Sequence, residues 1–310
     1  MVKRYKYPFV IFITSFFFLM VQVSLASEKN IGVIMTGDIS YYKEVHKAFI
    51  DALNASGFGH EKVNIILQTP APSVVPWSNA AKKLIAYDVD IIVTYGTPAT
   101  VAVLNEKPDK PIVFAGVYDP EVLEIKGKKV TGISSKVPVV TAIKYLRGIQ
   151  PFTKLGVIYN DSERDTIKQV NELRELEGQF GYQIIKFNVK KPEDAFKISG
   201  IEALFITTSC VARQCSYNVS TILRKEKIPA ASIMDTGGES GAILMITPDP
   251  EEQGRMAAQM VIKILRGESP SNIPIERPKK IEMIINLKEA SILGLKVPLD
   301  IITSATRVIK

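Results

Sequence analysis

The sequence predicts a doubly wound α/β protein. Short apolar runs such as Ile91-Ile92-Val93 and Ile112-Val113-Phe114 alternate with helical patterns along the 310 residues. Runs that are apolar at nearly every position suit strands buried on both faces, which means parallel sheets covered by helices. The order of strand, turn and helix starts again at Leu155–Tyr159, after Pro151. This restart predicts a second sheet.

Residues 1–26 are expected to form a secretory signal peptide that is not part of the fold. Three cations stand in the first six residues, the apolar run Pro8–Val23 follows, and Ser24-Leu25-Ala26 supplies small residues at the exit. This is the order of a signal peptide. We expect cleavage after Ala26 and export through the inner membrane to the periplasm. An uncleaved anchor is the alternative, and the run is near the lower limit for spanning a membrane.

The expected strands recur at short intervals and are each bounded by turn residues. They are Ile31–Met35, Val63–Gln68, Asp90–Thr94, Pro111–Gly116, Val130–Ile133, Lys154–Tyr159, Gln183–Phe187, Ala203–Thr207, Ala230–Met234, Ala242–Ile246 and Glu282–Asn286.

The segments between these strands have helical periodicity and marked ends. Ile167, Val170 and Leu173 fall on one stripe of a predicted helix. Asp249-Pro250 has the form of an N-cap followed by proline at the first helical position. Arg266-Gly267 closes the same helix with a cation and a glycine. An alternation of strands and helices over this length predicts doubly wound α/β structure.

Ligand-binding residues are expected at the carboxyl ends of the strands, where open α/β sheets bind their ligands. The expected set is Asp38, Tyr42, Tyr95, Thr97, Asp119, Tyr159, Asn160, Ser209 and Asp235. Helix N-termini can hold an anionic group, carboxylates an ammonium, and tyrosines an apolar part. This chemistry fits a small zwitterionic, amino-acid-like molecule. The alternative is that residues such as Thr97 and Asp119 only cap helices.

The motifs of common enzymes are missing from the sequence. His46 and His60 lie on a predicted helix and in a turn, and no G-x-S-x-G, Walker A or H-E-x-x-H motif occurs. We therefore expect no catalytic residues, no metal site and no cofactor. Of the formal charge of +7, three charges lie in residues 1–6. The mildly basic remainder gives no reason to expect nucleic acid binding.

Several motifs are shared with a known family. The most specific are Tyr95-Gly96-Thr97-Pro98-Ala99, Pro111–Val117 with Asp119-Pro120, Gly254–Ala258 and Ile285–Ala290. In these motifs and in the order of its elements, the chain resembles the ABC transporter substrate-binding proteins, which have the type I periplasmic binding protein (Venus-flytrap) fold. The resemblance is to the branch that includes tryptophan- and tyrosine-binding members.

The resemblance implies two Rossmann-like lobes joined by a hinge of three chain crossings, with the ligand in the cleft between them. Lobe 1 is expected to comprise 27–134 plus 249–275, and lobe 2 to comprise 135–248 plus 276–310. The helix that starts at Pro250 should therefore pack on lobe 1, and the strand at Glu282 should join lobe 2.

The resemblance also implies a function. It indicates the periplasmic solute-binding component of an ABC importer. This component captures a small amino-acid-like metabolite and delivers it to the permease in the inner membrane. It is expected to be a monomer. Two alternatives stay open: a secreted sensor subunit for a membrane kinase, and a secreted enzyme on the same scaffold. Thr207–Cys215 stands where relatives that bind aromatic amino acids often have an Asp-Asn segment, so the identity of the ligand is left open.

Cys210 and Cys215 are the two cysteines of the chain. Their C-x4-C spacing and the expected oxidising compartment predict a disulfide. Free thiols are one alternative, and redox or ligand chemistry is another. The pair supplies too few ligands for a structural zinc site.

Overall fold

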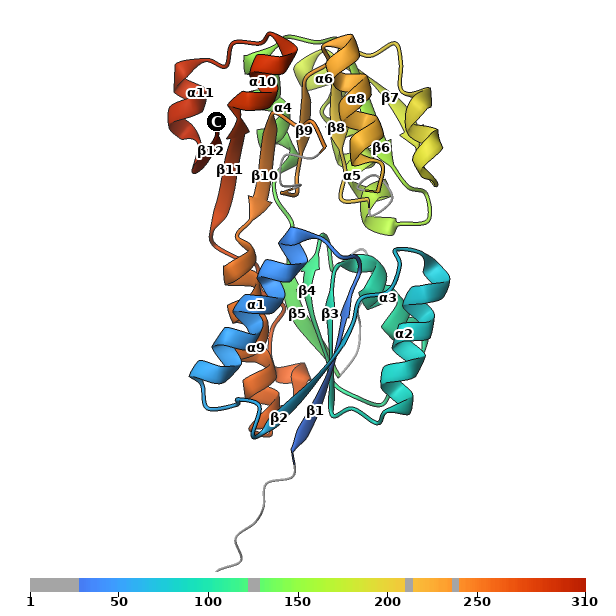
Figure 1. The fold of residues 1–310 in the computed structure, drawn as a ribbon, viewed down its shortest axis with the longest axis vertical. Helices are drawn as coiled ribbons and strands as arrows, with labels where there is room; N and C mark the ends of the chain where they lie inside the picture. The colour runs from blue at the N-terminus through green and yellow to red at the C-terminus, as the bar shows by residue number, and fades with distance from the viewer. Residues whose placement is uncertain (1–27, 122–128, 210–213, 236–239) are drawn as a thin grey trace, which may run out of the picture.

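The computed structural model describes residues 28–121, 129–209, 214–235 and 240–310, in which the chain forms two α/β lobes stacked end to end (Figure 1). The expected signal peptide lies outside the described residues, so its cleavage stays a prediction. No helix in the described part of the chain is both long enough and apolar enough to cross a membrane.

Lobe 1 holds a five-stranded parallel sheet in the order β2-β1-β3-β4-β5. Its strands are β1 (Lys29–Met35), β2 (Val63–Gln68), β3 (Ile91–Tyr95), β4 (Ile112–Val117) and β5 (Val130–Ser134). Its helices are α1 (Ser40–Ala55), α2 (Val74–Ala86), α3 (Thr97–Asn105) and α9 (Pro250–Leu265), with the short 3₁₀ segment η2 (Pro270–Asn272). Helices α1 and α9 pack on one face of the sheet, and α2 and α3 on the other.

Lobe 2 holds a seven-stranded sheet in the order β12-β11-β10-β9-β8-β6-β7. Its strands are β6 (Lys154–Tyr159), β7 (Gln183–Asn188), β8 (Ala203–Ile206), β9 (Ala230–Ser232), β10 (Leu244–Pro248), β11 (Ile281–Asn286) and β12 (Arg307–Ile309). Its helices are α4 (Val139–Ile149), α5 (Arg164–Glu175), α6 (Glu177–Phe180), η1 (Pro192–Lys197), α8 (Ser216–Glu226), α10 (Leu287–Leu293) and α11 (Leu299–Ser304). Every strand expected from the sequence is present, whereas β12 was not expected.

The chain passes between the lobes at three places in the described residues: after β5, between β10 and α9, and before β11. Gln253 of α9 ties its helix to lobe 1, because its side chain accepts from Gly116 N and donates to Ser134 O, each at 3.0 Å. Strand β11 pairs antiparallel with β10 in lobe 2. The packing that the resemblance implied for both elements is confirmed, while the exact lobe boundaries stay a prediction.

Helix α9 approaches α1 very closely. A Cβ atom on Gly254 would lie 2.2 Å from the Val45 carbonyl oxygen, so only glycine allows this contact. The helix begins as the sequence predicts: Asp249 is the N-cap, and its Oδ1 accepts from Glu252 N at 2.7 Å.

Candidate ligand-binding site

The carboxyl ends of the parallel strands in the two sheets face each other across the lobe boundary (Figure 1). Side chains from each lobe are buried at this boundary. Tyr118, which follows β4 of lobe 1, is 1% exposed and packs in the apolar cluster of lobe 2. Met234, which follows β9 of lobe 2, packs in the cluster of lobe 1 that contains Tyr41 and Tyr42. The two sheet ends are therefore in contact.

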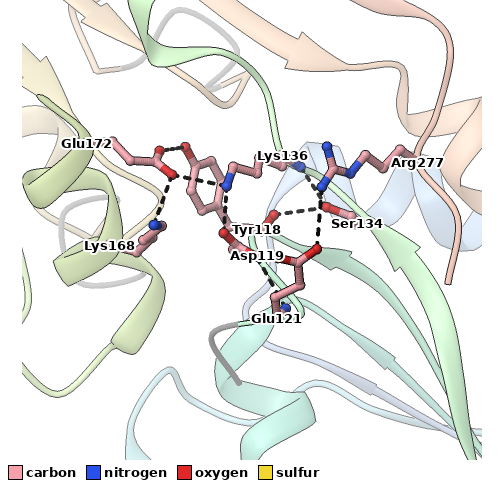
Figure 2. A network of polar contacts seen from close by, with 8 residues as sticks. All are labelled: Tyr118, Asp119, Glu121, Ser134, Lys136, Lys168, Glu172 and Arg277. Carbon is pink, nitrogen blue, oxygen red and sulfur yellow. Dashed lines mark hydrogen bonds and ion pairs between the residues drawn. The ribbon is translucent and has the colours of Figure 1, made fainter. Parts of the chain in front are cut away.

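A polar network links both lobes and the first crossing (Figure 2). Tyr118 Oη donates to Glu172 Oε2 on α5 at 2.5 Å. Lys136, in the crossing between β5 and α4, binds Asp119 Oδ2 at 2.6 Å and Glu172 Oε1 at 3.1 Å, and Lys168 lies 3.7 Å from the same Glu172 oxygen. Burial, and then the Glu172 carboxylate, raise the pKa of Tyr118, so its phenol remains a donor.

A second set of polar side chains surrounds Asp165, in the first turn of α5. Thr208 Oγ1 donates to Asp165 Oδ2 at 2.8 Å, and Gln169 bonds to both the hydroxyl and the backbone N–H of Thr208. Asp165 is only 5% exposed, and its Oδ1 has no hydrogen-bond partner in the described structure. Burial raises the pKa of Asp165, whereas the hydroxyls of Thr208 and Thr97 oppose that rise.

Four of the expected site residues lie buried at these strand ends. Thr97, at the start of α3, accepts from Tyr118 N at 3.4 Å and lies near Asp165 across the lobe boundary. Asp119 binds Lys136, as described above. Ser209 donates to Glu163 Oε1 at 3.0 Å. Asn160 accepts from Ser162 N at 2.9 Å, which orders the loop before α5.

Tyr95, another expected site residue, lies inside lobe 1. Its ring is fully buried in the core of lobe 1, where it packs against Phe49, and its phenol oxygen lies 3.2 Å from His46 Nδ1. Consecutive side chains of a strand point to opposite faces, and that of Tyr95 points to the α1 face. Tyr42 also lies in this cluster, with its hydroxyl over Gly96 at the end of β3.

Three further expected residues do not join the two networks. Asp38 is exposed and pairs with Lys43 at 2.9 Å. Tyr159 is half-buried against the core of lobe 2. Asp235 binds Arg307 of β12, so its carboxylate already has a cationic partner. Sequence reasoning missed this pairing because β12 was not expected.

The predicted disulfide is not formed in this structure. Cys215 is a free thiol, buried beside Val219 and Leu223 in the apolar cluster between the lobe 2 sheet and α8. Its thiol therefore packs into the core. Burial, and then the carboxylates of Asp194 and Glu193, raise its pKa to about 11. Cys210 lies outside the described residues.

The fold matches that of known proteins. The family model described as ABC transporter substrate binding protein matches residues 29–309. The chain belongs to this family. Among substrate-binding proteins, it is 26% identical over 272 residues to the Tyrosine-binding protein of Clostridioides difficile, covering 84% of this chain and 79% of that protein.

Solved structures of substrate-binding proteins share the fold. A Streptococcus pneumonia domain in complex with L-Trp has 22% identity and a TM-score of 0.85, covering 91% of this chain and 100% of that one. The ligand-free, open structure of a substrate binding protein from Clostridium difficile has 25% identity and a TM-score of 0.68, covering 91% and 99%. The expected type I periplasmic binding protein fold is confirmed.

Proposed function

We propose that this substrate-binding protein is the periplasmic receptor of an ABC importer, which captures a small amino-acid-like metabolite between its lobes and delivers it to the permease. The observation that carries the proposal is the burial of polar side chains from both lobes at the facing strand ends. Thr97 and Tyr118 come from lobe 1, and Asp165 and Ser209 from lobe 2. Buried polar groups need partners. Asp165 Oδ1 has none in the described structure, and a small polar ligand can supply one.

The relatives support an amino-acid ligand. One is named a tyrosine-binding protein, and another was crystallised with L-Trp. The higher TM-score to the L-Trp complex than to the open structure, at equal coverage of this chain, supports a closed arrangement of the lobes here. A ligand that binds the closed form better shifts the lobes towards closure. The permease would then recognise that closed form.

The remaining parts of the proposal rest on the sequence of residues 1–26 and on the family resemblance. Residues 1–26 direct export, cleavage follows Ala26, and the mature chain acts in the periplasm as a monomer without catalysis. The lobes 27–134 plus 249–275 and 135–248 plus 276–310 move as units about the three crossings.

A thermal-shift screen of the purified mature chain against amino acids, sugars and metal ions tests the proposal. A ligand that binds the folded protein raises its melting temperature by mass action. We expect one or more amino acids to raise it, and native mass spectrometry to show one molecule bound per chain. Stabilisation by sugars or metal ions alone would refute the proposal.

A further inference from the structure

We infer that Asp165 is the carboxylate that receives the ammonium group of the ligand, so that the protein selects metabolites bearing a primary amine. The inference rests on the proposed function and names the residue that sets its substrate class. Asp165 was not among the residues expected from the sequence.

The first argument is the unsatisfied oxygen. Asp165 Oδ2 accepts from Thr208 at 2.8 Å, but Oδ1 is buried and has no hydrogen-bond partner in the described structure. A buried polar atom without a partner costs free energy, and a buried charge costs more. Such a group in a binding protein is explained if a ligand supplies the missing donor.

The second argument is the lack of a cation. The carboxylates of Asp119 and Glu172 share Lys136, and that of Asp235 binds Arg307. In the described part of the chain, no Lys, Arg or His forms an ion pair with Asp165. Asp119 and Asp235 were the carboxylates expected to bind an ammonium, and both are already neutralised. Asp165 has no such cation in the described part of the chain.

The third argument is the position of Asp165 at the lobe boundary. The Thr97 hydroxyl of lobe 1 lies near the carboxylate, while Thr208 of lobe 2 bonds to it directly. An ammonium has three N–H donors, and threonine hydroxyls have lone pairs to accept them. An ammonium beside Oδ1 would therefore contact both lobes, which couples amine recognition to closure.

Titration calorimetry with three matched pairs of probes tests the inference. The pairs are L-tyrosine with 3-(4-hydroxyphenyl)propionate, L-tryptophan with indole-3-propionate, and L-leucine with 4-methylpentanoate. Each pair differs in the amine alone. We expect the wild-type protein to bind the amine-bearing member of a pair about 10- to 100-fold more tightly, as for a hydrogen bond between charged groups. Asp165→Asn should abolish that preference. The control Asp194→Asn removes another helical first-turn carboxylate, remote from the site and paired with Lys197, and should retain it.

Two results separate the inference from the proposed function. Equal affinity for both members of a pair, or an Asp165→Asn variant that keeps the preference, would overturn the inference and leave the binding function intact. Binding of no probe of either kind would overturn both. The melting temperature of the ligand-free Asp165→Asn variant gives an independent readout. It should rise at neutral pH, because a buried unpaired charge is removed, whereas a carboxylate with only a structural role would lower it when replaced.

Discussion

The phenol of Tyr118, at the end of β4 in lobe 1, donates a hydrogen bond of 2.5 Å to Glu172 on α5 of lobe 2. Lys136, in the first crossing, binds the same carboxylate at 3.1 Å and also Asp119 of lobe 1. One network therefore ties together lobe 1, the crossing and lobe 2 (Figure 2). The bond between Tyr118 and Glu172 is made only while the lobe ends are in contact, so it favours the closed arrangement.

Tyr118→Phe should weaken ligand affinity about 10-fold, because it removes a hydrogen bond to a charged group that the closed lobes make. Titration calorimetry with the amino acid that most raises the melting temperature gives the measurement. Tyr182→Phe is the matched control, since the Tyr182 hydroxyl donates to Leu173 O within lobe 2. Equal losses in the two variants would show that Tyr118 acts on lobe stability and not on closure.

Gly254→Ala should destabilise lobe 1 by about 1–3 kcal/mol, because the new Cβ would overlap the Val45 carbonyl of α1. Denaturant unfolding monitored by circular dichroism measures this change. Gly178→Ala, in α6, is the control, because no atom lies within 4 Å of the position that its Cβ would take. Alanine has the higher helix propensity, so this variant should be slightly more stable than the wild type. A Gly254→Ala variant as stable as the wild type would contradict the packing of α9 on α1.

The positions of the strands could be predicted from the sequence, but the surroundings of several side chains could not. The apolar runs located all the expected strands, while the return of α9 to lobe 1 came from the family resemblance, because periodicity carries no information on which sheet a helix covers. The packing of Tyr95 on the α1 face could not be predicted, because a strand end does not reveal which face a side chain takes. Asp165 was overlooked because Thr97 and Thr208, which lie beside its carboxylate, are far away in the sequence.

The ion pair between Asp249 and Lys280 should make the second and third crossings sensitive to acid. Burial raises the pKa of Asp249, but the Lys280 ammonium and the Glu252 N–H together lower it by more. The net pKa therefore lies below the usual 3.8. A carboxyl whose pKa is lowered on folding contributes stability above its unfolded pKa and loses it as the pH falls through the folded pKa. Asp249→Asn should therefore be less stable than the wild type at pH 7, by up to about 1 kcal/mol. The difference should shrink as the pH falls below 3.8 and through the lowered folded pKa of Asp249, and a difference that stays undiminished there would refute this account.

Cys215 should react slowly in the native protein. Its pKa of about 11 leaves little thiolate at pH 8, and the side chain is buried. Denatured, unreduced protein should titrate two thiols per chain, because the sequence has two cysteines and Cys215 is free. Titration of no thiols after denaturation would show that the two cysteines are bonded.

Small-angle X-ray scattering during ligand titration tests the central claim most directly, namely that a small metabolite is captured between two hinged lobes. The titrant is the amino acid that most raises the melting temperature. We expect the radius of gyration to fall as the lobes close, along a one-site curve whose midpoint agrees with the calorimetric affinity. A scattering profile that stays unchanged at saturation, while the melting temperature still rises, would place the ligand away from the lobe boundary and contradict the account.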